Sequence, residues 1–273
     1  MGLFKQNPFG HYLILKKWLI RTMGAMTHRR YRGFNRLKIE GSEIIKDLPE
    51  NGVLFVSNHQ TYFADVVAMY HVFNAALSGR VDNIKNIGYL WQPKLNIYYV
   101  AAAETMKSGF LPKLLAYAGS VSIDRTWRAQ GQEVNRQVKF SDITNIGKAI
   151  KDGWVITFPQ GTTTPWKPIR KGTAHIIKTY KPIVIPIVID GFRRSFDKKG
   201  INIKKRGILQ SIVIKEPLEI DYENETINQI VEKLEYAIEQ HPSFLKVISK
   251  EELETAEKLN EQRRFSAKMD FED

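Results

Sequence analysis

The sequence contains no cysteine among its 273 residues. Disulfide bonds, thiolate zinc sites and cysteine nucleophiles are therefore excluded. Its six histidines are scattered, and none stands in the His-Glu-x-x-His spacing of zinc hydrolases, so we expect no bound metal ion. Gly-x-Ser-x-Gly, Walker and Rossmann signatures are also missing. This argues against a serine hydrolase, a nucleotide hydrolase and a dehydrogenase.

Long apolar runs are missing as well. No stretch reaches the roughly 18 consecutive apolar residues that a membrane-spanning helix needs. The apolar run at residues 12–15 is ended by Lys16 and Lys17 and is not followed by a small-residue cleavage site. We therefore expect neither a spanning helix nor a signal peptide.

Acidic residues are too few to balance the basic ones. The formal net charge is +12 and the pI is about 9.6, which indicates an anionic partner such as nucleic acid, a lipid surface or a phosphorylated substrate. The N-terminal region is the most one-sided, because no acidic residue precedes Glu40. Residues 251–273 are acid-rich instead, and we expect residues 246–273 to form a charged tail.

Residues 1–35 are predicted to contain a basic amphipathic helix that docks on a membrane. Five apolar side chains share one face at helical spacing, namely Leu15, Trp18, Leu19, Met23 and Met26. Lys17 and Arg21 are predicted to lie opposite. Such a helix is typical of the interface of an anionic membrane, and we expect a peripheral or monotopic protein on the cytoplasmic face. The alternative is that the apolar face packs onto the core of the protein itself.

Between residues 36 and 245, apolar runs of strand length alternate with helical patterns. The predicted strands are residues 37–40, 53–56, 97–101, 120–124, 155–158, 183–189 and 210–214. The predicted helices are residues 65–77, 111–118, 143–150, 173–180 and 227–238, the last with a capping box of Thr226 and Gln229. This alternation predicts one α/β domain with a largely parallel mixed sheet flanked by helices.

Polar residues follow three of the predicted strands. Asn58-His59 ends one strand, Asp124-Arg125 another, and residues 159–162 a third. Strand ends in such sheets carry the chemistry, so these loops are expected to form one cleft. A histidine with a nearby carboxylate, here His59 and Asp65, is the minimal equipment for general-base catalysis. The alternative is a polar loop whose histidine only satisfies local backbone groups.

Four segments, in order, resemble the blocks of glycerolipid acyltransferases, most closely the lysophosphatidate type. They are residues 58–65, 119–125, 158–162 and 185–187, and the resemblance spans half the chain, from about 53 to 191. It implies an α/β fold with a membrane-docking N-terminal element. It also implies transfer of a fatty acyl group from acyl-CoA or acyl carrier protein to the free hydroxyl of lysophosphatidate, giving phosphatidate. No cofactor and no nucleic-acid partner are expected.

The resemblance also assigns roles to individual residues. His59 would be the general base, and Asp65 would hold its tautomer and stabilise the imidazolium. The predicted substrate-binding residues are Arg125, Gln160, Gly161, Thr162, Arg170 and Lys171. Among these, the cations are candidate phosphate clamps, and Gly161 is a candidate for an oxyanion or phosphate nest. His71 and His175 fall within helical patterns and are expected to be structural.

The chain departs from the family pattern in two places. The family usually has four residues between its histidine and aspartate, whereas five separate His59 from Asp65. In the third block, Gln160 replaces a glutamate and Thr163 an arginine that the family uses for the acceptor phosphate. Two alternatives therefore stand beside the main prediction. One is an acyltransferase for another lyso-lipid, such as an amino-acid lipid, and the other is a catalytically dead membrane-binding homologue.

Overall fold

The computed structural model describes residues 5–107, 109–123, 128–129, 132–133 and 140–245. The chain divides into two compact units, residues 1–240 and residues 241–273. In the second unit the described part contains a short 3-10 helix, Pro242–Phe244. The predicted boundaries at residues 35 and 245 stay predictions, and the predicted tail lies outside the described residues.

The first unit is built on a seven-stranded sheet with the order β1-β9-β8-β2-β7-β3-β4. The strands are β1 (Arg36–Glu40), β2 (Val53–Ser57), β3 (Ile97–Ala102), β4 (Ser120–Ile123), β7 (Trp154–Thr157), β8 (Ile183–Asp190) and β9 (Leu209–Ile214). Pairing is parallel throughout except between β8 and β9. All seven predicted strands and the largely parallel mixed sheet are confirmed. A separate two-stranded ribbon joins β5 (Arg128–Ala129) to β6 (Gln132–Glu133).

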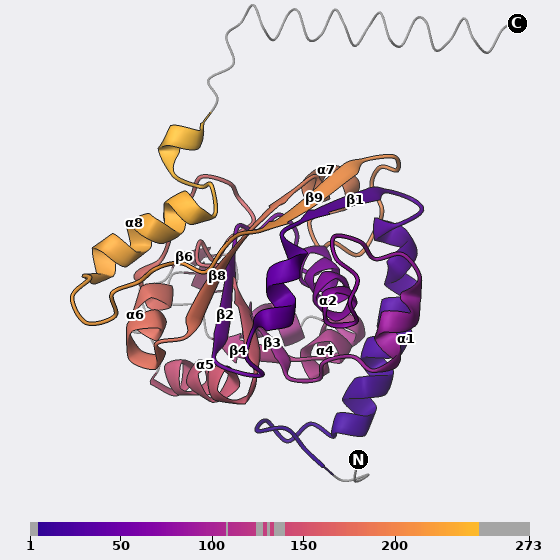
Figure 1. Cartoon of the computed structure of the whole chain (residues 1–273), viewed down its shortest axis with the longest axis horizontal. Coiled ribbons are helices and arrows are strands. Elements are labelled where there is room, and N and C mark those ends of the chain that lie inside the picture. Colours follow the sequence, from indigo (N-terminus) through magenta and orange to yellow (C-terminus); the bar gives the residue numbers. More distant parts are fainter. Residues whose placement is uncertain (1–4, 108, 124–127, 130–131, 134–139, 246–273) are drawn as a thin grey trace, which may run out of the picture. The chain divides into compact units, whose positions relative to one another are not determined.

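Helices surround this sheet (Figure 1). The longer ones are α1 (Leu13–Tyr31), α2 (Ala64–Leu77), α4 (Phe110–Tyr117), α5 (Phe140–Asp152), α6 (Lys171–Tyr180) and α8 (Ile227–Ala237). The five helices predicted after residue 36 are confirmed, as is the capping box at the start of α8. The sequence pattern did not predict the short elements η1 (Ser42–Asp47), η2 (Ile87–Trp91), α3 (Ala103–Lys107) and α7 (Phe192–Ser195). They are too short to show a helical period.

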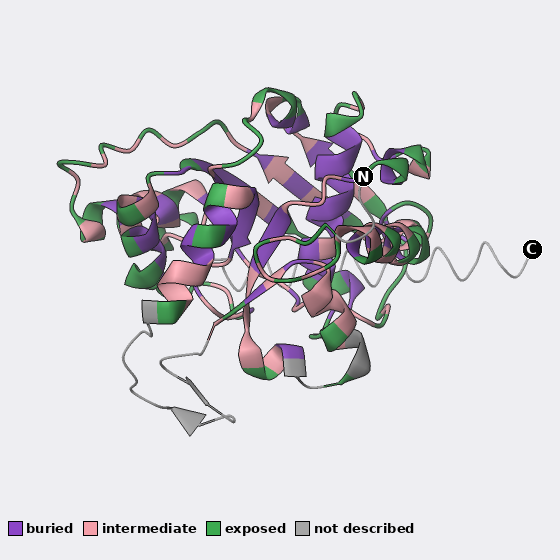
Figure 2. Ribbon diagram, turned by 90° about the horizontal axis from the view of Figure 1, so that it is seen from below, coloured by how far each residue is buried: buried purple, intermediate pink, exposed green. Residues whose placement is uncertain are grey.

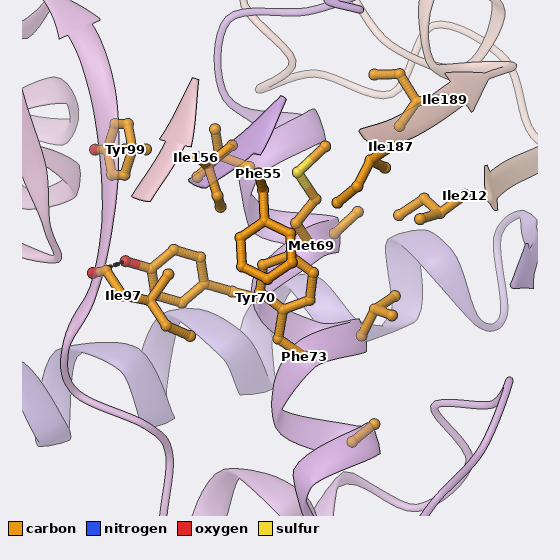
Figure 3. Close-up of a cluster of buried hydrophobic side chains, with 14 of the residues drawn as sticks. Phe55, Met69, Tyr70, Phe73, Ile97, Tyr99, Ile156, Ile187, Ile189 and Ile212 are labelled. Atoms are coloured by element: carbon orange, nitrogen blue, oxygen red, sulfur yellow. Dashed lines mark hydrogen bonds between the residues drawn. The ribbon is translucent and has the colours of Figure 1, made fainter. Parts of the chain in front are cut away.

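The central strands are buried on both faces, so their side chains alternate between two cores. Val53 and Phe55 of β2 point into one core with α1 and α2, and Leu54 and Val56 point into the other with α5, α6 and α8. Figure 2 shows the buried residues concentrated between these layers. In the first core, Phe55 stacks on Phe73 with ring centroids 4.3 Å apart (Figure 3).

The side of α1 that faces the core is not its predicted apolar face. Its buried side consists of Lys16, Ile20, Gly24, Thr27 and Tyr31, and it packs against α2 and η2. Three residues of the predicted apolar face, Leu15, Trp18 and Met26, are exposed and do not pack onto the core as the alternative prediction required. The prediction that Arg21 lies opposite this face was wrong, because its guanidinium lies 5.4 Å from the Trp18 ring. Side-chain hydrophobicity does not mark the core-facing side, because a lysine, a glycine and a threonine belong to it.

None of the helices in the described part of the chain is both long and apolar enough to cross a lipid bilayer.

Candidate active site

His59 and Asp65 meet at the carboxyl end of β2. The His59 Nδ1 and Asp65 Oδ2 atoms are 2.9 Å apart, and the aspartate is completely buried. A carboxylate can only accept, so Nδ1 must carry the proton and Nε2 keeps its lone pair. The imidazole ring stacks on Phe158 with a centroid distance of 3.9 Å. The pair therefore has the orientation and tautomer of a general base with its aspartate.

The loop between the two residues accommodates the unusual spacing. Residues 60–63 lie outside α2, so the extra residue lengthens the loop and does not rotate Asp65 around the helix. The Asp65 carboxylate accepts hydrogen bonds from the backbone of Gln60, at 2.6 Å, and from the backbone and hydroxyl of Thr61. Four donors in all converge on one buried carboxylate, so its oxygens are hydrogen-bonded despite their burial.

A second segment supports this loop from outside. The backbone N–H groups of Tyr62 and Phe63 donate to the carbonyls of Lys198 and Lys199, at 3.1 and 3.0 Å. The adjacent Gly200 has a φ of +76°, and a Cβ there would lie 2.6 Å from the Ala64 backbone nitrogen. Only glycine allows this approach, because an L-residue would be strained and would collide with the loop. The connection between α7 and β9 thus fixes the catalytic loop.

Two side chains tie β2 to β8 beside the histidine. The Asn58 amide donates to the Ile189 carbonyl at 2.9 Å and accepts from the Ile189 N–H at 2.8 Å. The Gln60 side chain donates to the Asp190 carboxylate at 3.2 Å. These contacts hold the ends of the first and fourth sequence blocks together.

Gln160 is buried and hydrogen-bonded within the protein, and its role in substrate binding stays a prediction. It is 2% exposed, and its amide nitrogen donates to the Lys167 carbonyl at 2.8 Å and to the Gln240 side chain at 3.2 Å. An ionised glutamate could donate neither bond. The geometry therefore gives a physical reason for glutamine here, which is to hold the loop after β7.

The rest of this loop forms an internally bonded turn. Gly161 has a φ of +65°, and its N–H donates to the Phe158 carbonyl at 2.9 Å. That N–H is therefore engaged within the protein in this conformation and does not form a free nest donor. The Thr162 hydroxyl accepts from the Thr164 N–H at 3.2 Å. The turn lies beside His59 because Phe158, on which the imidazole stacks, begins it.

The predicted phosphate-binding cations are only partly placed. Arg170 and Lys171 are exposed at the start of α6, and the Arg170 N–H donates to the Pro159 carbonyl at 3.0 Å. They thus adjoin Pro159, at the start of the loop that follows β7. Arg125 lies outside the described residues. The prediction of a metal-free site stays a prediction, although no group of metal-ligating side chains converges within the described ranges.

His71 has a structural environment. It is buried on α2, where Thr27 lies 3.0 Å and Tyr89 2.8 Å from its ring nitrogens. Burial, assisted by the charge of His28, lowers the pKa of His71 to about 3. His175 is exposed on α6.

Sequence reasoning missed two residues at this site. Thr61 is fully buried and donates to Asp65 at 2.6 Å. Arg193 follows the end of β8, and its backbone N–H donates to the Gln60 side chain at 3.1 Å. A basic residue just after a fourth strand end was the signal for Arg193. Nothing in the sequence distinguishes Thr61 from an ordinary loop threonine.

An apolar pocket adjoins the catalytic loop. It is partly open and lies between α1, α2, η2 and β3. Its lining includes Leu19, Met23, Phe63, Val67, Leu90 and Tyr99. Phe63 belongs to the loop between His59 and Asp65, so the pocket and the imidazole share one structural element.

Comparisons with known proteins agree with this architecture. The chain resembles the crystal structure of the 1-acyl-sn-glycerophosphate (LPA) acyltransferase PlsC from Thermotoga maritima, with a TM-score of 0.52 and 18% sequence identity over 86% of this chain and 81% of that one. At this identity the likeness shows the fold. No curated protein sequence matches the chain. The model of the Acyltransferase family matches residues 36–190, more than half of the chain. The chain therefore belongs to the acyltransferase family.

Proposed function

We propose that this acyltransferase moves a fatty acyl group from a thioester to the free hydroxyl of lysophosphatidate, producing phosphatidate. The observation that carries the proposal is the contact of His59 with the buried Asp65 at 2.9 Å. It supports an active enzyme over a catalytically dead homologue, because the extra loop residue has not separated the pair. The substrate named for the Thermotoga maritima protein and the apolar pocket beside Phe63 support a lyso-lipid acceptor.

The proposed reaction is direct transfer. His59 Nε2 takes the proton of the acceptor hydroxyl while its oxygen attacks the thioester carbonyl. The tetrahedral intermediate collapses, the carbon–sulfur bond breaks, and the thiolate leaves with the proton returned from the imidazolium. Asp65 stabilises that imidazolium. The released thiol is coenzyme A or the thiol of acyl carrier protein, and the basic surface suits either anionic donor.

The proposal is tested by identifying the product. The purified full chain is incubated with lysophosphatidate in mixed micelles and with acyl-CoA or acyl carrier protein, and lipids are analysed by mass spectrometry. We expect phosphatidate that depends on the donor. A parallel incubation offers a lyso-lipid with an amino-acid headgroup. Acylation of that lipid alone would favour the alternative acceptor, and the absence of any product would favour the inactive homologue.

We further propose that α1 and η2 dock on an anionic membrane at its cytoplasmic face. Trp18 and Trp91 are 56% and 71% exposed, and the Arg21 guanidinium lies between them, 4.4 Å from the Trp91 ring. Leu15 and Met26 extend the exposed apolar surface along α1. Exposed tryptophans next to a cation match the chemistry of a headgroup layer.

Replacing both tryptophans by serine is expected to weaken binding to anionic vesicles by roughly tenfold or more, because the apolar contact area is lost. Co-sedimentation measures the bound fraction. High salt should also weaken binding of the unmodified chain, since it screens the basic residues. Tyr236→Ser is the control, because Tyr236 is an exposed aromatic residue on α8, across the sheet. Equal binding by the double variant and the unmodified chain would contradict this surface.

A further inference from the structure

Arg193 lies between the loop that joins His59 to Asp65 and the loop that follows β7. It belongs to α7, directly after β8, and its backbone N–H donates to the Gln60 side chain at 3.1 Å. The backbone N–H of Gln60 donates in turn to Asp65 at 2.6 Å. Arg193 is therefore connected to the His59–Asp65 pair through a single residue.

The guanidinium of Arg193 reaches the loop that follows β7. Its Nη2 atom donates to the Thr163 carbonyl, although 30 residues separate the two in sequence. Thr163 is buried and uncharged, so the positive charge at this point of the site comes from Arg193. Anchoring to a carbonyl fixes the guanidinium and leaves most of its five N–H donors free for a ligand.

The neighbouring arginine provides a contrast on the same short helix. Arg194 forms an ion pair with Asp190 at 2.8 Å, and the two side chains are 62% and 59% exposed. Arg193 is also exposed, yet it forms no ion pair with any carboxylate in the described part of the chain. A positioned guanidinium without a counter-ion, beside a catalytic base, is suited to bind an anion.

We propose that Arg193 binds the phosphate of the acceptor lipid and thereby selects a phosphate-bearing acceptor. This inference rests on the proposed acyl transfer. The fork of a guanidinium matches two phosphate oxygens, and its tether to Thr163 lowers the ordering cost of binding. The hydroxyl to be acylated lies a few bonds from that phosphate in a lysophosphatidate molecule, so one molecule can contact both Arg193 and His59.

The test compares Arg193→Gln with Arg194→Gln on two acceptors, lysophosphatidate and monoacylglycerol of the same chain length. We expect Arg193→Gln to lower kcat/KM for lysophosphatidate by about tenfold or more, mainly through KM, because a charge-assisted hydrogen bond is lost. Use of monoacylglycerol should change little. Arg194→Gln should change neither, since an exposed ion pair contributes little. Arg193→Lys should restore part of the loss.

Binding of lysophosphatidate in mixed micelles to the same variants is measured alongside. It separates this inference from the proposed function, because binding needs no turnover. Weaker binding by Arg193→Gln, with no effect of Arg194→Gln, supports the phosphate contact even if the unmodified chain acylates a different acceptor. Equal effects of Arg193→Gln on both acceptors, or unchanged lysophosphatidate binding, would overturn it.

Discussion

Substitution of His59 by alanine is expected to reduce acyl transfer by about 10²–10⁴-fold, the usual contribution of a general base. The substitution removes the group proposed to take the hydroxyl proton, while Asp65 keeps its backbone and Thr61 donors. The rate is measured with saturating donor and acceptor, so that the loss appears in kcat. Circular dichroism and thermal unfolding of the variant should match the unmodified chain, because the His59 side chain is partly exposed at the edge of the sheet.

His175→Ala is the matched control for this experiment. His175 is an exposed histidine on α6 and has no part in the proposed mechanism, so its removal should leave the rate unchanged. Turnover of His59→Ala close to that of the control would rule out His59 as the base. A large loss of thermal stability in His59→Ala would instead show that the residue has a structural role.

The second large effect concerns Lys16, a fully buried lysine on α1. Its Nζ donates to the Ile97 carbonyl at 3.3 Å and lies 4.6 Å from the centre of the Tyr98 ring. Burial lowers the pKa of Lys16 to about 7, although the charge of Asp152 acts in the opposite direction. In the unfolded chain the same amine keeps its usual pKa near 10.4.

The direction of the pH effect follows from these two values. Between about pH 7 and pH 10 the unfolded chain binds more protons at Lys16 than the folded chain does, so stability rises with pH across this window. Lys16→Met removes the group and the dependence. We expect the variant to be more stable near pH 7 by on the order of 4 kcal/mol, with the gain shrinking toward pH 10. The Ile97 carbonyl stays satisfied, because the Tyr70 hydroxyl donates to it at 2.7 Å.

Urea unfolding between pH 7 and pH 9.5 measures this prediction. This pH range lies above the pKa values of two histidines. The pKa of His11 is lowered by burial and by Lys16, and that of His71 is about 3. The range also lies below the pKa values of the buried tyrosines Tyr70 and Tyr98, which burial raises. Lys17→Met is the control, since Lys17 is only half-buried. If Lys16→Met destabilises the protein equally at both ends of the window, the lysine stabilises the docking of α1 and does not oppose it.

The pattern of apolar and polar side chains predicted most of the fold. The seven strands of the main sheet and five of its helices were predicted within a few residues, because buried strands read as short apolar runs and helices as a 3.6-residue period. The side of α1 that faces the core was not predicted. Its core-facing side includes Lys16, Gly24 and Thr27, and these residues lie against β3, η2 and α2 respectively.

The candidate site divides in the same way. The sequence identified His59 and Asp65, since both belong to one local segment. It could not establish that they meet, because the loop that accommodates the extra residue is held by Lys198, Lys199 and Gly200, more than 130 positions away. Gln160 stays a predicted substrate-binding residue, and its position in a motif could not reveal the hydrogen bonds by which it holds a loop.

The sequence by itself thus determined the α/β class, the positions of the strands and the residues of the first motif, because each depends on neighbours in the chain. Tertiary structure alone decided which residues of α1 face the core, how Asp65 reaches His59, and that Arg193 adjoins Thr163. Each of these depends on contacts between distant segments that share no local pattern. The side-by-side placement of β2, β7 and β8 brings those segments together, and it forms only when the sheet does.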